Sequence, residues 1–375
     1  MNILFIAYSF CPNVGGVERV TDIIAARLKK RGHSIYYLCA DKNGNCTDAR
    51  FDVLRMNKSV NEAYDQDSVS IYQRLLTDKH IDVIINQYPS SPKSDFFLIH
   101  ALPGIRKISF FHGKPFGRVK WEMRTYLRKC RIKPFIGSLL RIVQTRRRFK
   151  RFFELSDKVG LLCAGYIDCL AEECGIDRQK AFHIANPNTF DILRPEEISA
   201  KDNIILFVGR ISDIGKNIID FIKVWKLIWD KYPTWKAIIV GDDTGCTAQK
   251  QYIESHNIHN IEFVGQQTDV RPFYKRAKIN CMTSHTEGWP MVLAEGLSCG
   301  CVSCVFNTFE SARELVKDRH NGFLIQPYDI QAMADSLSAL MADKNLTDNM
   351  AKSALKRAEQ FTIDKIIDAW EMILK

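Results

Sequence analysis

Two glutamates separated by seven residues, Glu287 and Glu295, lie in the segment HTEGWPMVLAEGLSCG. Because Pro290 suits the first turn of a helix, we expect Glu287 in the loop before this helix and Glu295 inside it. The N–H groups at a helix start suit phosphate and sugar oxygens, and a carboxylate suits vicinal hydroxyls. A helix with two ordinary acids is the alternative, although Glu295 stands among apolar residues and needs a partner if it is buried. The expected amides are those of Gly288, Trp289, Met291 and Val292.

Two cations, Arg210 and Lys216, stand in the segment GRISDIGKN, between an apolar run and the start of a predicted helix. Fixed cations beside the N–H groups of a helix start make a good diphosphate site. Neither GxGxxG nor GxxxxGKS/T occurs in the chain, so no dinucleotide or P-loop fingerprint applies. A surface loop with two solvated bases explains this segment alone equally well.

Two weaker signals also follow apolar runs. Gly15 and Gly16 come after the first run of the chain, and paired glycines let the backbone approach a ligand closely. Many turns contain two glycines, however. His112, in SFFHGKP, follows another apolar run. A lone histidine is more often structural than catalytic, and this position raises the catalytic expectation only modestly.

All four segments need a scaffold that gathers the ends of strands. Short apolar runs alternate with amphipathic helical patterns through both halves of the chain, which predicts parallel sheets covered by helices on both faces. Ligands bind outside the carboxyl ends of such strands, so the loops that follow strands should hold the chemistry. Predicted strands include 2–9, 34–40, 82–87, 107–111, 158–163 and 181–185, and predicted helices include 17–30, 217–231, 247–255, 290–298, 330–342 and 362–374.

The alternating pattern is interrupted near NPNTFDILRPEEISAKDN by prolines and acids. We therefore expect an α/β fold of two facing Rossmann-like domains, residues 1–195 and 196–358, with a deep cleft between them. Residues 359–375 are expected to form a helix that crosses back onto the first domain.

One segment carries the whole basic excess of the chain. The net charge is +10, and residues 114–151 contain fourteen Lys/Arg and one acid, Glu122. Aromatic and aliphatic residues are interleaved, most densely in TRRRFKRFF. A pair of amphipathic helices with a solvated basic face, a surface for anionic lipid, and a nucleic-acid site are the three alternatives. Charge alone favours the solvated face.

The composition is that of a soluble globular protein, with 46% hydrophobic and 26% charged residues. No apolar run reaches the roughly 18–20 residues of a membrane span, and MNILFIAYSF indicates a first strand and not a signal peptide. Among the twelve cysteines, only Cys301 and Cys304 have CxxC spacing. Cys299, Cys301 and Cys304 are expected to be buried thiols, with zinc less favoured, and the cytoplasm is the default compartment.

Taken in order, these segments resemble the GT-B retaining glycosyltransferases of family 4, glycosyl transferases group 1. The resemblance covers most of the chain, and its most specific element is the Glu-x7-Glu pair in EGWPMVLAEG. Many members have glycine where this chain has Asn188 and Asn217, which are common variations. The other matching segments are GGVERV, FFHG, ANPNTF, FVGRISDIGKN, IIVGDD, IEFVGQQTDV, ESARELV and NGFLI.

The resemblance implies a role for each site residue. Arg210 and Lys216 would hold the diphosphate of a nucleotide-sugar, and Glu295 would bind its ribose. Glu287, with the amides after it, would contact the donor sugar. The first domain would bind the acceptor and the second the donor. The remaining implied contacts are Gly15 and Gly16 with the donor phosphate, His112 with the donor sugar and acceptor side, Val270 beside the nucleobase, and Pro290 at the donor helix.

The implied reaction moves a hexose or N-acetylhexosamine, most favourably from a UDP-sugar, to a saccharide or polyprenyl-diphosphate-linked acceptor in cell-surface polysaccharide or glycolipid biosynthesis. Two cations and helix N–H groups would stabilise the leaving diphosphate without a metal or another cofactor. Asp242–Asp243 lacks the context of a magnesium-binding DxD element. A lipid-linked acceptor raises the expectation of peripheral contact with the anionic inner face of the membrane, and no nucleic-acid motif is visible.

Three alternatives to a transferase stay open at this point. A GT-B nucleotide-sugar 2-epimerase would share the fold and the diphosphate site, although the arrangement of Glu287 and Glu295 favours the transferase. A catalytically silent sugar- or lipid-binding module and a basic nucleic-acid-binding protein are less favoured. Donor identity, acceptor, linkage and oligomeric state are not specified by these motifs.

Overall fold

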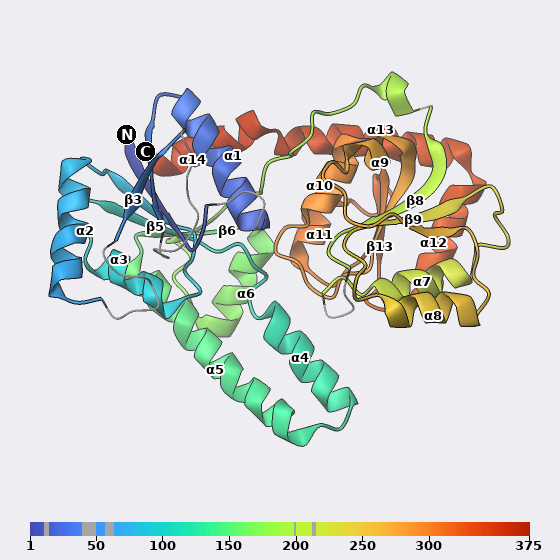
Figure 1. Cartoon of the computed structure of the whole chain (residues 1–375), viewed down its shortest axis with the longest axis horizontal. Coiled ribbons are helices and arrows are strands. Elements are labelled where there is room, and N and C mark those ends of the chain that lie inside the picture. Colours follow the sequence, from blue (N-terminus) through green and yellow to red (C-terminus); the bar gives the residue numbers. More distant parts are fainter. Residues whose placement is uncertain (11–14, 40–49, 57–63, 199, 212–214) are drawn as a thin grey trace. The chain divides into compact units, whose positions relative to one another are not determined.

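The computed structural model describes residues 1–10, 15–39, 50–56, 64–198, 200–211 and 215–375 (Figure 1). They form an N-terminal domain, Met1–Pro187 with Ile363–Lys375, and a C-terminal domain, Asn188–Thr362. The sequence predicts this boundary at 195/196. It lies earlier because Leu193 and Ile198 are buried in the core of the C-terminal domain, where the Leu193 N–H donates to the Ser298 carbonyl at 2.8 Å.

A sheet of seven parallel strands forms the centre of the N-terminal domain, in the order β3-β2-β1-β4-β5-β6-β7. Apart from Asn2, every residue of β1 and β4 is buried, as is typical of central strands covered on both faces. The strands are β1 (Asn2–Ala7), β2 (Ser34–Cys39), β3 (Asp52–Arg55), β4 (Val83–Asn86), β5 (Arg106–Phe110), β6 (Lys158–Leu161) and β7 (Ala181–His183). The helices are α1 (Gly16–Lys30), α2 (Gln66–Asp78), α3 (Asp95–Ile99), α4 (Gly117–Arg128), α5 (Ile132–Leu155), α6 (Ala164–Cys174) and α14 (Ile363–Leu374).

The last helix, α14, is part of the N-terminal core. Trp370 is fully buried, with its ring centroid 5.1 Å from that of Phe110 and 6.2 Å from that of Phe182. At the surface, Arg27 of α1 pairs with Asp364 at 2.5 Å. The end of the chain therefore completes a domain that the first half of the chain begins.

A sheet of six parallel strands forms the centre of the C-terminal domain, in the order β10-β9-β8-β11-β12-β13. Its strands are β8 (Asp202–Val208), β9 (Lys236–Val240), β10 (Ile261–Phe263), β11 (Ala277–Met282), β12 (Val302–Phe306) and β13 (Gly322–Ile325). Its helices are α7 (Ile218–Lys226), α8 (Thr247–Ser255), α9 (Arg271–Arg276), α10 (Met291–Ser298), α11 (Glu310–Leu315), α12 (Ile330–Ala342) and α13 (Lys344–Ala358). Each domain is thus Rossmann-like, as the sequence predicts.

Both strand orders change direction once. In the N-terminal domain this switch point lies between β1 and β4, and in the C-terminal domain it lies between β8 and β11. Loops at the carboxyl ends of two strands diverge at a switch point and leave room for a ligand. The loops that follow these four strands therefore have the best position for a binding site.

Glycine is required where the ends of β8 and β9 approach each other. Gly241 has a φ of +155°, and a Cβ atom built on it would lie 1.9 Å from the carbonyl oxygen of Gly209. The Gly209 N–H donates to the Val240 carbonyl at 3.0 Å. A larger residue at 241 would therefore separate the backbone segments that open onto the loop of Arg210 and Lys216.

The three cysteines near 300 are buried and free, as expected from their apolar surroundings. The Cys301 thiol lies 3.3 Å from the Tyr274 carbonyl and 3.2 Å from the Ala277 carbonyl. Burial raises the pKa of the Cys299 thiol to about 12. These thiols are packing residues of the C-terminal core.

No described helix combines the length and the apolar composition that crossing a membrane requires.

Candidate active site

Hydrogen bonds join the loop after β8 to the loop after β11. The His285 N–H donates to the Gly215 carbonyl at 3.0 Å, and the Thr283 hydroxyl donates to the Asn217 carbonyl at 2.8 Å. The Asn217 side-chain amide donates to the Thr283 carbonyl at 3.2 Å in return. The two loops at this switch point therefore form one connected unit.

Asn217 starts α7 in the left-handed conformation, with φ 53° and ψ 51°. Among non-glycine residues, asparagine adopts this region most readily. This explains physically why asparagine can stand at a left-handed position that otherwise favours glycine. The Asn217 amide also donates to Asp220 at 2.7 Å, which fixes the first turn of α7 beside Lys216.

The connected loops bring Lys216 and Glu287 together. The Lys216 Nζ lies 2.7 Å from the Glu287 Oε1, and the two side chains are 20% and 16% exposed. Arg210 is exposed, and it forms no ion pair with any described residue. The loop thus holds one paired cation and one cation available to an anionic ligand.

Glu295 lies inside α10 and is 2% exposed. The Thr189 hydroxyl donates to its Oε1 at 2.9 Å, which supplies the partner that a buried acid requires. Tyr274 lies nearby, and burial, with the Glu295 charge as a smaller cause, raises the pKa of its hydroxyl well above the usual range. The sequence could not identify Thr189, because it is far from Glu295 along the chain.

The start of α10 holds the other predicted donor-site residues. Pro290 precedes the helix in an extended conformation, and Gly288, Met291 and Val292 are half-buried beside it. The Trp289 side chain is buried with its centroid 5.2 Å from that of Phe361, and its indole N–H has no hydrogen-bond partner among the described residues. Val270 lies at the start of α9, half-buried at the edge of the core.

Two acids that follow β9 have partners within their own loop and helix α8. Asp242 accepts a hydrogen bond from the Thr244 N–H at 3.1 Å, which lowers the pKa of the Asp242 carboxyl. Asp243 pairs with Lys250 at 2.6 Å. Their side chains therefore stabilise the loop and the start of α8.

A cavity of about 420 Å³ lies at the switch point of the N-terminal domain, where the loops after β1, β4 and β5 meet. The predicted residue His112 lines it, together with Tyr8, Glu18, Gln87 and Gly113. Gly16 is the first residue of α1, and a Cβ atom built on it would meet nothing within 4 Å, so a ligand has room to approach it. At Gly15 an added Cβ would lie 2.6 Å from the Glu18 carboxylate.

Gln87 is a functional candidate that the sequence did not indicate. It is buried, and its side-chain carbonyl contacts the Nε2 of His112. Neither the His112 Nδ1 nor the Gln87 side-chain N–H has a partner among the described residues. Burial lowers the pKa of His112 to about 3, so the ring is neutral near pH 7. The pair therefore holds one acceptor and one donor, both buried and without a described partner, beside a cavity that the two residues line.

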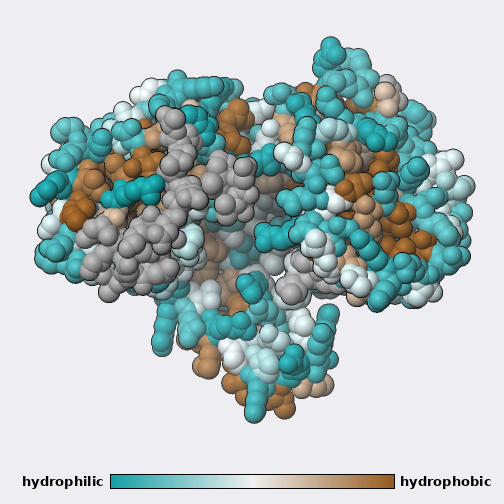
Figure 2. Space-filling model, in the orientation of Figure 1, coloured by the Kyte–Doolittle hydropathy of each residue, from teal (hydrophilic) through white to brown (hydrophobic). Residues whose placement is uncertain are grey.

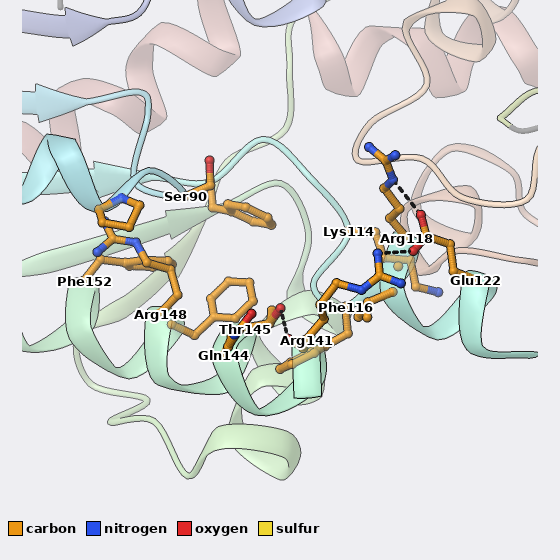
Figure 3. A pocket seen from close by; sticks show the side chains of 15 residues that line it. Ser90, Lys114, Phe116, Arg118, Glu122, Arg141, Gln144, Thr145, Arg148 and Phe152 are labelled. Carbon is orange, nitrogen blue, oxygen red and sulfur yellow. Dashed lines mark hydrogen bonds and ion pairs between the residues drawn. The ribbon is translucent and has the colours of Figure 1, made fainter. Parts of the chain in front are cut away.

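A larger cavity of about 680 Å³ lies where α4 and α5 join the domain (Figure 3). Four phenylalanines and four cations line most of it, and it shares Ser90 and Phe111 with the smaller cavity. Figure 3 shows Arg118 and Arg141 both directed at Glu122, at 3.0 and 2.6 Å. The cavity is suited to a ligand with apolar and anionic parts. Its aromatic residues are Phe111, Phe116, Phe149 and Phe152, and its cations are Lys114, Arg118, Arg141 and Arg148.

Comparison with known proteins matches both domains. The family described as Glycosyltransferase Family 4 matches residues 14–187, and the family described as Glycosyl transferases group 1 matches residues 188–357. The two matches meet where the structure divides into domains. The chain belongs to the GT-B glycosyltransferases.

Two curated relatives show how far this glycosyltransferase is similar to other members. An uncharacterized glycosyltransferase of Haemophilus influenzae is 26% identical over 96% of this chain and 97% of its own length. An alpha-1,4-N-acetyl-D-galactosaminyltransferase of Campylobacter jejuni, named for a PP-undecaprenol-linked saccharide, is 30% identical over 45% of this chain. That alignment spans 47% of the Campylobacter enzyme, so its specificity does not transfer directly.

Among solved structures, Anabaena HepE in complex with UDP and glucose has a TM-score of 0.73 with this glycosyltransferase. The comparison covers 100% of this chain and 99% of HepE, at 19% sequence identity. At that identity the likeness shows the GT-B fold, which agrees with the two Rossmann-like domains.

Proposed function

We propose that this enzyme is a retaining glycosyltransferase that uses a nucleotide-sugar, most favourably a UDP-linked hexose or N-acetylhexosamine. The donor would bind to the C-terminal domain and the acceptor to the N-terminal domain. The acceptor we propose is a saccharide, either free or linked to a polyprenyl diphosphate, in cell-surface polysaccharide or glycolipid biosynthesis. The transfer reaction would take place in the cytoplasm, at the inner face of the membrane.

The observation that carries this proposal is the 2.7 Å contact between Lys216 and Glu287 at the switch point of the C-terminal domain. A nucleotide-sugar places its diphosphate next to its sugar, so a site for it needs a cation beside a sugar-binding acid. Lys216, with Arg210 in the same loop, suits the diphosphate, and Glu287 suits sugar hydroxyls. The UDP and glucose bound to HepE support a donor of this class.

In the proposed reaction, the oxygen of an acceptor hydroxyl forms a bond to the anomeric carbon on the face that the diphosphate leaves. The bond between that carbon and the phosphate oxygen breaks, and its electron pair goes to the nucleoside diphosphate. The acceptor proton goes to the same phosphate oxygen, so no separate general base is needed. Arg210, Lys216 and the N–H groups at the start of α10 stabilise the negative charge that develops, without a metal.

His112 has a positioning role in this proposal. Its ring is neutral near pH 7, and the contact of Nε2 with the Gln87 carbonyl leaves Nδ1 as a hydrogen-bond acceptor. Such a group can accept a hydrogen bond from a sugar hydroxyl and fix its orientation. The low pKa makes it a poor proton acceptor.

The test is to incubate the enzyme with UDP-glucose, UDP-galactose, UDP-N-acetylglucosamine and UDP-N-acetylgalactosamine, with and without a polyprenyl-diphosphate-linked saccharide and with and without EDTA. We expect acceptor-stimulated, EDTA-resistant release of UDP. The anomeric proton of the product should have the same configuration as that of the donor by NMR. Sugar isomerisation without release of UDP would favour the epimerase, and no heat of binding with any donor would exclude the proposed donor site.

A further inference from the structure

The hairpin formed by α4 and α5 exposes six large apolar side chains near its turn. Each is between 44 and 72% exposed, and they fall within a stretch from Leu127 to Val143. Figure 2 shows hydrophobic surface gathered over the end of this hairpin. Single exposed apolar residues are normal, but a contiguous group marks an interaction surface. We call this surface the hairpin tip: Leu127, Ile132, Ile136, Leu139, Leu140 and Val143.

The spacing of the five tip residues on α5 places them on one side of the helix. With about 100° of rotation per residue, they fall within an arc of roughly 100°. Phe149, Phe152 and Phe153, which are buried in the domain, fall on a different side of the same helix. Helix α5 therefore has two apolar sides, and the side chains on one of them are 44–72% exposed.

Ion pairs neutralise many of the cations away from the tip. Arg146 pairs with Glu173 at 2.7 Å, and Lys120 contacts the same carboxylate. The hydrogen bond from Arg146, and to a smaller extent that from Lys120, lowers the pKa of the Glu173 carboxyl. Arg148 pairs with Asp95 at 2.6 Å. Two arginines of the densest basic run, TRRRFKRFF, therefore form ion pairs inside the domain, which the sequence could not show.

Other cations stay exposed beside the tip. Lys129, Arg131 and Lys133 are exposed around the turn and form no ion pair with described residues. Arg147 and Lys150 are also exposed and unpaired within the described chain, and they continue the apolar side of α5. At 1.5 Å per residue they begin about 10 Å beyond Leu140 along the helix axis. On this side of α5, apolar residues are followed by cations. A lipid bilayer has the same order, with apolar acyl chains followed by anionic headgroups.

We propose that the hairpin tip docks on the surface of an anionic phospholipid bilayer. The apolar side chains enter the boundary between headgroups and acyl chains, and the adjacent lysines and arginines contact lipid phosphates. A second copy of the chain is a weaker occupant, because two tips in contact would bring Lys129, Arg131 and Lys133 of both copies together. This inference concerns the hairpin alone and does not depend on the proposed reaction.

The first test measures binding of the full chain to sedimented vesicles of phosphatidylcholine mixed with phosphatidylglycerol, and to pure phosphatidylcholine vesicles. Wild type should bind the anionic vesicles more strongly. Leu139→Ser combined with Leu140→Ser should reduce that binding at least about tenfold. Each of Lys129→Gln and Lys133→Gln should reduce it about fivefold, and only on the anionic vesicles.

Met372→Ser is the matched control, because Met372 is an apolar residue of α14 that is 76% exposed and far along the chain from the tip. It should bind as wild type does. All variants change exposed side chains and should keep the wild-type melting temperature, so loss of binding would not reflect unfolding. Wild type that fails to bind anionic vesicles, or tip variants that bind unchanged, would overturn the inference.

The turn of the hairpin offers a direct probe of insertion. Cys130 is exposed in that turn and can carry an environment-sensitive fluorophore. The labelled variant would have serine in place of the half-buried Cys169 and of Cys11 and Cys46, which lie outside the described residues. Its emission should shift to shorter wavelength with anionic vesicles. If light scattering instead shows a dimer that the Leu139 and Leu140 variants convert to a monomer, with no change in emission or vesicle binding, the tip binds a second copy and our inference is wrong.

Discussion

Replacing Lys216 with alanine removes the ammonium group that lies 2.7 Å from Glu287. If that ammonium stabilises the leaving diphosphate, the loss should be that of one preorganised donor, about 2.7–4 kcal/mol or a factor of about 10²–10³ in kcat. The ion pair is largely shielded, at 20% and 16% exposure, so its removal should also destabilise the fold by about 1–2 kcal/mol. That is far too little to unfold a domain and explain the loss of turnover.

The assay separates two roles that Lys216 could have. If it binds the diphosphate, Lys216→Ala should weaken the binding of UDP in calorimetry. Glu287→Gln should then strengthen UDP binding, because it removes a negative charge that repels the diphosphate, while it slows sugar transfer. If Lys216 serves only to hold Glu287, the double variant should be no slower than Glu287→Gln alone.

Lys223→Ala is the matched control. Lys223 is on the adjacent helix α7 and also pairs with an acid, Asp220, at 3.3 Å. Its removal should leave both UDP affinity and turnover unchanged. Our reasoning on the diphosphate site would be refuted by wild-type UDP affinity and wild-type turnover in Lys216→Ala.

Three further results are expected. Glu295→Gln should raise the KM for the donor by at least about tenfold with a smaller change in kcat, because a neutral amide is a weaker acceptor for ribose hydroxyls; an unchanged KM would argue against that contact. Because the folded-state pKa of His112 is about 3 and the unfolded pKa is near 6.5, its contribution to stability is complete above pH 6.5 and is lost as the pH falls toward 3; the melting temperature of His112→Gln should therefore decline less steeply over this window. Gly241→Ala should destabilise the protein by more than about 3 kcal/mol in urea unfolding, whereas Gly245→Ala, where an added Cβ meets nothing within 4 Å, should not.

Elements with a strong local pattern were predictable from the sequence. The helices α8 and α12 begin and end at the predicted residues 247–255 and 330–342. Strand β3 and helix α2 were missed. Strand β3 has four residues at the edge of its sheet and no long apolar run. The sequence did carry one signal for helix α2, because Asp65 is a favourable N-cap residue. In the structure its side chain accepts a hydrogen bond from the Ser68 N–H at the start of this helix.

The site was predictable where it depends on topology and not where it depends on distant contacts. Lys216 and Glu287 each follow a strand, and the rule that carboxyl ends of parallel strands lie at one edge places them near each other. Gln87 has no local signal, and the segment ANPNTF, which contains Thr189, did not indicate the contact with Glu295. Their partners His112 and Glu295 are 25 and 106 residues away. The pairing of the basic segment was hidden for the same reason.

The charges of the loop after β8 show how the proposed donor site can stay folded and still bind an anion. A half-buried ammonium without a partner would destabilise the loop, and Glu287 supplies that partner at 2.7 Å. The ammonium has three N–H donors, so it can donate to a diphosphate without first losing the carboxylate. Arg210 stays exposed and adds charge that no described acid neutralises. An anion that carries hydroxyl groups beside its phosphates can bind both cations and the acid at once. A simple phosphate would leave Glu287 without a hydroxyl partner. This difference favours binding of a nucleotide-sugar over binding of its fragments.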